Sequence, residues 1–274
     1  MSAAVVSGPA LTGVARSFRK PRLTWLKALV LPVALLLLWD FLARRGVGQG
    51  MSFVTLGQLG EALVAAIASG DLMQNVATSL GRVGIGVIAG SLLGIALGTA
   101  MALVPAIDRI FGPVFHAIRQ VPTLGWIPLL GLWFGYGEFP KLLIVTKAAM
   151  FPMVLSAYEG LRTVRRSDIE VGQVLTFDPW TMFWRVRVPA AMPMIITGLQ
   201  QALGFAWVAC VGTEILFGSG LGIGAMIEHG QIQGQMETVL LGVIFVGLIA
   251  CIINGLFSRL AAHQLRWRDV EEAA

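Results

Sequence analysis

The stretch LGRVGIGVIAGSLLGIALGTAMALV, residues 80–104, runs for 25 residues with a single charged side chain, Arg82. A transmembrane helix needs about 20 predominantly apolar residues, so this stretch is long enough to cross a bilayer. Small residues recur in it at every fourth position, which places them on one helix face and lets a neighbouring helix approach closely. We therefore predict a membrane-spanning helix with a packing face made by Gly86, Gly90, Gly94 and Gly98.

The rest of the chain has the same membrane character. Of its 274 residues 56% are hydrophobic and 13% are charged, whereas a soluble domain has about 45–50% and about 25%. The mean hydropathy is +0.79 and the isoelectric point about 9.8. This composition excludes a water-soluble monomer, and the length suits one polytopic domain rather than two. The net charge of +5 reflects membrane topology, and we expect no nucleic-acid partner.

Apolar runs divide the chain into a basic tail (residues 1–25), one transmembrane domain (26–261) and a C-terminal tail (262–274). A further segment, Leu56–Ser69, has leucines and an isoleucine at helical spacing and predicts an amphipathic helix on the membrane surface. The fold class is thus an all-α membrane protein with about six transmembrane helices. The predicted spans are Leu26–Ala43, Leu80–Val104, Leu124–Tyr136, Leu142–Leu161, Ala190–Phe217 and Thr238–Leu260.

Lysine and arginine residues orient these spans. Five lie in the first 27 residues, two follow the second span, five lie between Arg162 and Arg187, and three follow the sixth span. With an even number of spans, these 15 of the 20 basic residues fall on one side of the membrane, while Arg44 and Arg45 fall on the other. Positive residues collect in the cytoplasm. We therefore expect a multi-pass membrane protein with both termini cytoplasmic.

The polar segment at about residues 163–189, between spans four and five, predicts two short helices. Ser167 and Glu170 have the spacing of a capping box, which predicts a helix from Ser167 to about Thr176. Asp178 followed by proline predicts a second helix start. Pro189 then marks the entry into span five.

The second of these helices carries aromatic residues, Trp180, Phe183 and Trp184, on one side. Two explanations are open. The aromatic side chains dock into a groove of a partner protein, or the helix lies on the lipid headgroups. We favour the partner protein.

At this segment the sequence resembles the permease subunits of bacterial ABC importers, whose motif is E-A-A-x3-G-x9-I-x-L-P. Glu170, Gly172, Thr176 and Pro189 match its spacing without a gap. The motif's two alanines are replaced by valine and Gly172, and its glycine by Thr176. Because β-branched threonine disfavours a left-handed backbone, we expect the turn to lie at Phe177 and Asp178 instead.

Further motifs resemble the subgroup that imports nitrate, sulfonates, taurine and bicarbonate. They are VPTL (121–124), IPL (127–129), WFGYGE (133–138), PAAMP (189–193), TGL (197–199), Glu214 and GSGLG (218–222). The resemblance implies that the segment at 163–189 is the coupling loop, seated on an ATPase. It also implies a second permease copy, two ATP-binding subunits, a periplasmic or lipid-anchored substrate-binding protein and a location in a bacterial inner membrane.

Motifs for chemistry within this chain are missing from the sequence. There is no G-x-x-x-x-G-K-[ST] phosphate loop, so ATP and Mg²⁺ are expected on the partner ATPase. His116, His229 and His263 lie far apart without further ligands nearby, which argues against a metal site. We expect no catalytic residue and no cofactor in this chain.

Ionisable residues inside spans are costly and are therefore functional candidates. Lys147 is a candidate for attracting an anion in the path, or its stem extends to the headgroups. Glu214 is a second candidate for lining the substrate path. Its negative charge, however, suits pairing with a helix end or with Lys147 better than binding an anion. Trp133 is a third, or it anchors the interface. For Arg82 we favour a role between helices or at the headgroups.

The mechanism implied by the resemblance is alternating access driven by the ATPase, with a small anion such as an alkanesulfonate as the first substrate candidate. Two rival classes stay open from the residues alone. One is a stand-alone secondary transporter driven by an ion gradient, and the other is a membrane scaffold without transport.

Overall fold

The computed structural model describes residues 24–45 and 54–264, and in these the regular elements are helices. The basic tail and most of the C-terminal tail predicted above lie outside the described residues. The elements are α1 (Thr24–Arg44), α2 (Leu56–Ala68), α3 (Asp71–Leu103), α4 (Pro105–Gln120), η1 (Thr123–Trp126), α5 (Ile127–Phe134), α6 (Glu138–Arg162), α7 (Arg166–Val174), α8 (Pro179–Met182), η2 (Phe183–Arg187), α9 (Val188–Phe217), α10 (Ile223–Gln233) and α11 (Met236–Gln264).

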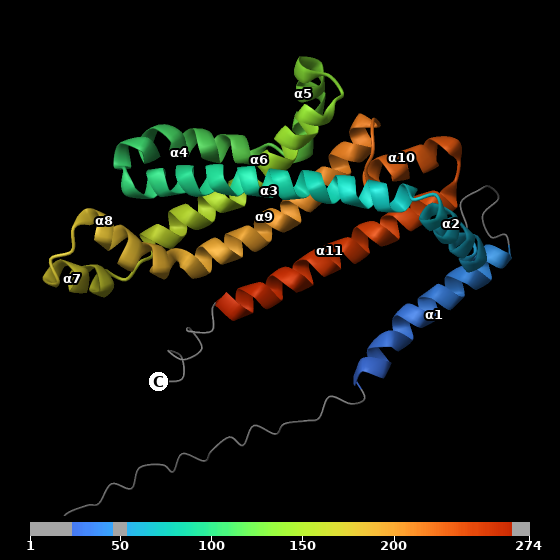
Figure 1. Ribbon diagram of the computed structural model, residues 1–274, viewed down its shortest axis with the longest axis horizontal. Coiled ribbons are helices and arrows are strands. Elements are labelled where there is room, and N and C mark those ends of the chain that lie inside the picture. Colours follow the sequence, from blue (N-terminus) through green and yellow to red (C-terminus); the bar gives the residue numbers. More distant parts are fainter. Residues whose placement is uncertain (1–23, 46–53, 265–274) are drawn as a thin grey trace, which may run out of the picture.

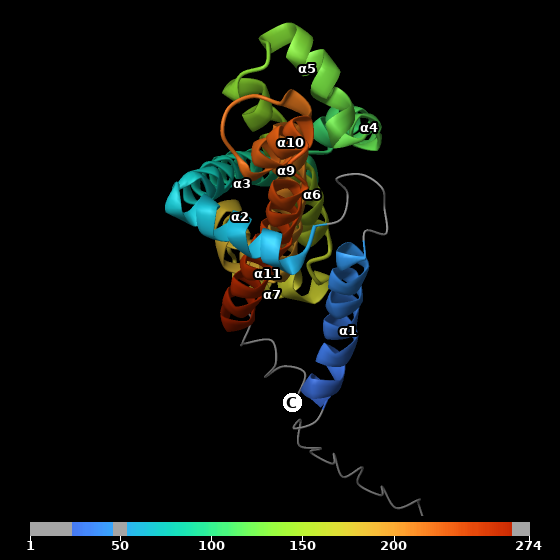
Figure 2. The same ribbon diagram turned by 90° about the vertical axis from the view of Figure 1, so that its right-hand side faces the viewer.

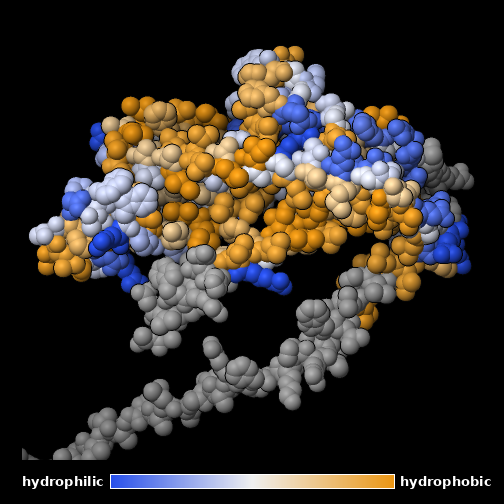
Figure 3. All heavy atoms as spheres, in the orientation of Figure 1, coloured by the Kyte–Doolittle hydropathy of each residue, from blue (hydrophilic) through white to orange (hydrophobic). Residues whose placement is uncertain are grey.

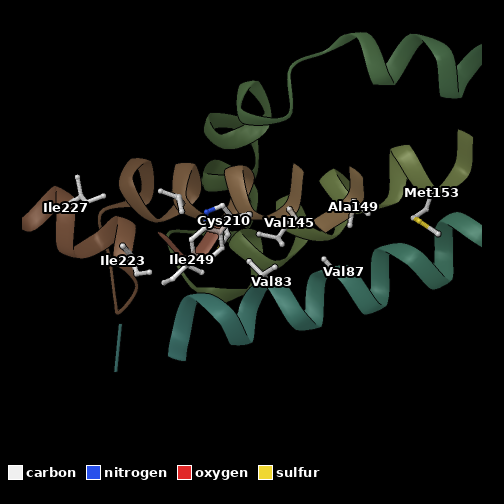
Figure 4. Packing of buried hydrophobic residues seen from close by; sticks show 13 residues of the cluster. Val83, Val87, Val145, Ala149, Met153, Cys210, Ile223, Ile227 and Ile249 are labelled. Carbon is white, nitrogen blue, oxygen red and sulfur yellow. The ribbon is translucent and has the colours of Figure 1, made fainter. Parts of the chain in front are cut away.

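Three long helices, α3, α6 and α9, form the centre of the molecule, with α6 packed against both others. Their shared core contains Val83 from α3, Val145 from α6 and Cys210 from α9, each at most 3% exposed. Figure 4 shows these side chains pointing toward one another, with Ile223 of α10 and Ile249 of α11 closing one end. Burial of these apolar and small side chains holds the long helices together.

The two ends of this bundle differ in composition. The short helices α7 and α8 lie at one end, and α2 and α10 lie at the other (Figure 1). Figure 3 shows hydrophilic residues at both ends and a hydrophobic surface over the long helices between them. Such an apolar belt between two polar ends is the pattern of a protein that spans a membrane.

Four helices of the described residues are long and apolar enough to cross a membrane: α3, α6, α11 and the continuous helical stretch Pro179–Phe217. They contain the predicted second, fourth, sixth and fifth spans. Helix α1 contains the predicted first span and is 21 residues long, but it is not among these four.

The predicted third span, Leu124–Tyr136, is not one long helix in the structure. Pro122 separates α4 from η1, and the helix that follows, α5, has only eight residues, which is about 12 Å. The helical segment between α3 and α6 therefore begins earlier, at Pro105, and is broken at Pro122. The charged residues of α4 hid this segment from a search for apolar runs, because they make the helix amphipathic.

Helices α1 and α2 are joined at a corner. The Asp40 side chain accepts a hydrogen bond from the Leu56 backbone N–H (3.0 Å), and the Trp39 indole donates to the Val54 carbonyl (3.0 Å). A capping box of Thr55 and Gln58 begins α2, which has no buried residue, as expected for a surface helix. Figure 2 shows α1 standing apart from the bundle.

Candidate functional site

The glycine face of α3 lies directly on α6. A Cβ atom built on Gly90 or Gly98 would collide with a backbone carbonyl of α6, from Thr146 or Val154 respectively. At Gly86 and Gly94 it would collide with side chains of α6. The two backbones are therefore in contact at each of these four turns, and no larger residue fits without moving the helices apart.

Helix α7, the first helix of the predicted coupling loop, starts differently from the prediction. Its N-cap is Arg165, without a side-chain cap, and Ser167 lies within the first turn. The Ser167 hydroxyl donates to the neighbouring Asp168 carboxylate (3.3 Å). The predicted capping box of Ser167 and Glu170 was therefore wrong, because the helix begins one residue before the serine that was to cap it.

The left-handed turn after α7 lies at Thr176, whereas we predicted it at Phe177 and Asp178. Thr176 has a φ of +53°, in the left-handed region. The Phe177 N–H donates to the Gly172 carbonyl (3.0 Å) and the Thr176 N–H to the Gln173 carbonyl (2.9 Å). This is the Schellman pattern of a helix end. These two hydrogen bonds offset the strain of a β-branched residue in that conformation.

Gly172 lets α7 and α8 pack closely. A Cβ atom on Gly172 would lie 2.6 Å from the Met182 Cε atom, and Met182 is buried. Gly172 thus stands where the motif has an alanine, and the Met182 side chain occupies the space that the alanine methyl group would need. The angle between the two short helices is set by this contact and by the turn at Thr176.

Asp178 caps α8, as predicted. Its carboxylate accepts from the backbone N–H groups of Trp180 (3.1 Å) and Thr181 (3.2 Å). Hydrogen bonds from the Thr181 side chain and backbone hold the pKa of the Asp178 carboxyl below its usual range. The cap keeps the start of α8 formed at neutral pH.

The aromatic residues of α8 and η2 form an exposed cluster. Trp180 is 69% exposed and Trp184 51% exposed, and their rings meet edge to face at 5.6 Å. The Phe183 ring meets Trp184 at 5.2 Å. An apolar cluster at a polar end of the molecule is a surface that a partner can cover.

Pro189 does not separate this cluster from the long helix behind it. The π-helical turn η2 leads directly into α9, and the Val188 N–H donates to the Phe183 carbonyl across five residues. A proline ring clashes with the carbonyl four residues before it in a regular helix, and the wider π turn relieves that clash. The aromatic cluster and α9 are therefore parts of one continuous helical rod.

At the opposite end of the bundle, four charged side chains from α3, α6 and α9 form a cluster, here called the charge cluster: Arg82, Lys141 and Glu214, which are buried, and Glu138, which is 56% exposed. Arg82 donates to Glu138 through Nε (2.6 Å) and one terminal nitrogen (2.8 Å), and its other terminal nitrogen donates to Glu214. Lys141 lies 3.6 Å from Glu138. Glu214 and Lys141 are fully buried.

The charge cluster holds the glycine-rich loop between α9 and α10. Arg82 donates to the Leu221 carbonyl (2.7 Å), and Lys141 donates to the Ser219 carbonyl. The Gly224 N–H, at the start of α10, donates to Glu214 (2.9 Å). Glu214 was predicted to pair with a helix end or with Lys147, and it pairs with a helix end and with Arg82, not with Lys147.

Two neutral side chains of α3 complete the charge cluster. The Ser79 hydroxyl donates to Glu214 (2.8 Å) and accepts from the Ile223 N–H (2.9 Å). The Asn75 amide oxygen accepts from the Gly222 N–H (2.7 Å). Two cations and two carboxylates balance, and each charge has a partner, as buried charges require. The cluster is thus built to hold the loop in place rather than to react.

Lys147 lies in a different environment, on the middle of α6. Its Nζ atom is buried and has no hydrogen-bond partner among the described residues. It lies over the Trp126 ring (4.6 Å to the centroid) and near the Phe151 ring (5.1 Å). Trp133, the third predicted path residue, lies on α5 and is 62% exposed, with its ring against Phe134 (6.4 Å).

A hollow of about 310 Å³ opens beside Lys147, between α4, η1, α6 and α9. Phe151, whose ring contacts Lys147, is one of its walls. Its polar lining residues are Arg119, Thr123 and Gln201. Within the part of the chain that the structure describes, no three His, Cys, Asp or Glu side chains are placed to hold a metal ion.

The sequence prediction missed several of these residues. Lys141, Ser79 and Asn75 were not singled out. The signal for Lys141 was its position three residues after Glu138, which puts the two charges on one helix face. Nothing local in the sequence marks Arg119 as a residue that lines a hollow.

Comparison with known proteins gives the family. The model of the family described as "Binding-protein-dependent transport system inner membrane component" matches residues 86–268. The putative aliphatic sulfonates transport permease protein SsuC of Bacillus subtilis (strain 168) is 29% identical over 253 residues, 92% of this chain and 91% of that protein. The taurine transport system permease protein TauC of Escherichia coli (strain K12) is 34% identical over 67% of this chain and 66% of that protein.

A solved structure has the same fold. A chain of the MetNI methionine ABC transporter, in inward-facing conformations, superposes with a TM-score of 0.58 over 69% of this chain and 94% of that chain. The sequence identity is 15%, so this likeness shows the fold alone.

Proposed function

We propose, since the chain belongs to the family of binding-protein-dependent transport system inner membrane components, that two copies of it line the path of an ATP-driven importer. The observation that carries this is the family match over residues 86–268, which runs from the glycine face of α3 to beyond α11. A stand-alone secondary transporter or a scaffold is disfavoured by the same match, because the family consists of subunits of a transport system.

The proposed membrane topology has six passes. Four are the long apolar helices, and α1 and the broken pass of α4, η1 and α5 are the others. The broken pass is needed because α3 and α6 both end near α7 (Figure 1), so the chain must return between them. In this topology both termini would lie on the side of α7 and α8, and the excess of basic residues predicted for that side supports a cytoplasmic assignment.

The coupling to ATP is proposed to occur at α7 and α8. The exposed rings of Trp180 and Trp184 would seat in a cleft of the ATPase, of which two copies bind the two permease copies. The Schellman turn at Thr176 and the contact of Gly172 with Met182 support this, because they make the segment a rigid shape. ATP and Mg²⁺ would be bound by the ATPase, and this chain would hold no cofactor.

The proposed substrate is a small organic anion, such as an alkanesulfonate. The names of the relatives SsuC and TauC refer to sulfonates and taurine, and the unpaired Lys147 supports an anion. A periplasmic or lipid-anchored binding protein would deliver it at the end that carries α2 and α10. The helices would then alternate between outward-open and inward-open states as the ATPase closes and opens.

The coupling proposal is tested by the double variant Trp180→Ala/Trp184→Ala. We expect at least a tenfold loss of the ATPase that co-purifies with the tagged permease in mild detergent, because large aromatic side chains dominate interfaces. Membrane insertion should be unchanged, measured as the amount of permease in the membrane fraction.

The matched control is Phe111→Ala, which removes an exposed aromatic side chain of α4 outside the coupling segment. It should retain the ATPase. Full ATPase recovery with the double tryptophan variant would contradict the proposed docking. Purification of the wild-type chain without any ATPase would contradict the importer itself.

A further inference from the structure

The hollow between α4, η1, α6 and α9 lies inside the length of the bundle. Helix α4 turns back from the end of α3 and runs for 16 residues, which is about 24 Å, while α3 runs for 33 residues, about 50 Å. Arg119 is in the last turn of α4. Since α4 runs back beside α3 (Figure 1), Arg119 lies about halfway along α3, with its side chain exposed.

The polar groups of this hollow have no partner in the chain. Arg119 and Gln201, which are exposed, and Thr123 line it, and their side chains make no hydrogen bond or ion pair with the described residues. The Nζ atom of Lys147, against the Phe151 wall, is buried and also unpartnered. Charged groups at membrane depth are expensive unless they meet water, a partner or a ligand.

The charge of the hollow has one sign. No aspartate or glutamate is among the described residues that line it, and Asp108 of α4 is engaged elsewhere, by the Tyr158 hydroxyl (2.9 Å). Arg119 and Lys147 thus produce an uncompensated positive region. A guanidinium fork, a hydroxyl and an amide are together suited to the oxygen atoms of an anionic head group.

The remaining walls are apolar. Phe151, Pro152 and Leu155 of α6 and Phe205 of α9 face the hollow. Its volume of about 310 Å³ is at the small end of the range for ligand sites, about 300–1,000 Å³. A bare inorganic anion would leave most of this apolar wall without a contact, whereas a short carbon chain or ring would fill it.

We propose that this hollow is a binding site within the permease for a small organic anion, with the head group on Arg119, Thr123 and Gln201 and the carbon part against Phe151 and Phe205. The inference rests on the proposed function, because it takes the transported substrate as the ligand. It adds the residues that select the substrate and the preference for an organic over an inorganic anion.

The test uses the full-length chain in lipid nanodiscs, with the subunits that remain bound to it, and titration calorimetry with three probes: butanesulfonate, ethanesulfonate and nitrate. We expect butanesulfonate to bind more tightly than ethanesulfonate, and nitrate to bind at least tenfold more weakly than butanesulfonate. Arg119→Gln should raise the Kd for butanesulfonate at least tenfold. Phe205→Ala should remove the difference between the two sulfonates.

The matched control is Arg109→Gln, since Arg109 lies on the same helix, is exposed and does not line the hollow. Its Kd should equal that of the wild type. Absent sulfonate binding, equal binding of nitrate, or an unchanged Kd in Arg119→Gln would each overturn the site. Co-purification of the ATPase is scored in the same samples, so loss of the site with the ATPase retained is distinguished from failure of the importer function.

Discussion

The charge cluster and the hollow both place basic side chains inside an apolar bundle, but they treat them in opposite ways. In the charge cluster, Arg82 contacts two carboxylates and a backbone carbonyl. In the hollow, Arg119 is exposed and has no partner among the described residues, and beside the hollow the buried Nζ atom of Lys147 meets only aromatic rings. The difference teaches how to separate two roles. A buried charge whose partners are all in the chain holds the structure together, whereas a buried charge without one, such as Lys147, is available to a ligand.

The largest effect is expected from breaking the charge cluster. Arg82→Met leaves Glu214 buried without its cation, and breaking a buried ion pair costs about 3–5 kcal/mol. We expect a loss of this size in stability, measured as a fall in the thermal unfolding temperature in nanodiscs. The double variant Arg82→Met/Glu214→Met should recover part of the loss, because it removes the stranded charge.

Arg109→Met is the control for this experiment, because Arg109 is exposed and makes no ion pair among the described residues. Its unfolding temperature should stay within the small change typical of surface substitutions. A similar fall in Arg82→Met and Arg109→Met would remove the structural role assigned to the charge cluster.

The next effect, of opposite sign, is expected at Lys147. Lys147→Met removes a desolvated cation, whose unmet hydrogen bonding costs about 1–3 kcal/mol, and loses cation–π contacts of about 0.5–2 kcal/mol. The net expectation is a stability gain of about 1 kcal/mol, together with a fall in the uptake of butanesulfonate of about tenfold. Thermal unfolding and transport into vesicles measure the two.

Lys147→Arg keeps the charge and should preserve uptake. A stability loss in Lys147→Met comparable to that in Arg82→Met would show that the lysine is structural after all. The cations of the two regions would then contribute to stability in the same way.

The smallest effect is expected at the turn after α7, outside both regions. A non-glycine residue in the left-handed region costs about 1–2 kcal/mol, and glycine loses about 0.5–1 kcal/mol through its more flexible unfolded chain. Thr176→Gly should therefore stabilise the chain by about 0.5–1 kcal/mol, seen as a slightly higher unfolding temperature. A lower temperature would mean that the threonine side chain makes a contact worth more than the strain.

The long helices could be predicted from the sequence because their apolar runs are uninterrupted. The proposed broken pass could not be predicted. Helix α4 carries charges, and Pro122 interrupts the segment after it, so neither part has the length and the hydropathy of a span. The turn at Thr176 also escaped prediction. Its intrinsic preference opposes the left-handed conformation, and the two hydrogen bonds of the Schellman pattern, which overcome that preference, are visible only in the structure.

The candidate sites were harder to predict than the fold. Arg82 and Glu214 were each recognised as costly charges, but they lie 132 residues apart, and no local pattern pairs them. The hollow is lined by residues from four elements. Its distinguishing feature is that its polar side chains have no hydrogen-bond partner among the described residues. Such a feature becomes visible only when the whole bundle is in place.

The helical rod Pro179–Phe217 has a mechanical consequence. From Trp180 in the aromatic cluster to Glu214 it extends for about 51 Å, and Glu214 clamps the far end to α3 and to the start of α10. A lever fixed at one tip turns about that tip. A tilt of about 5° would carry the aromatic rings by about 4 Å while the glycine-rich loop stays in place, so the charge cluster would serve as the fulcrum of the molecule.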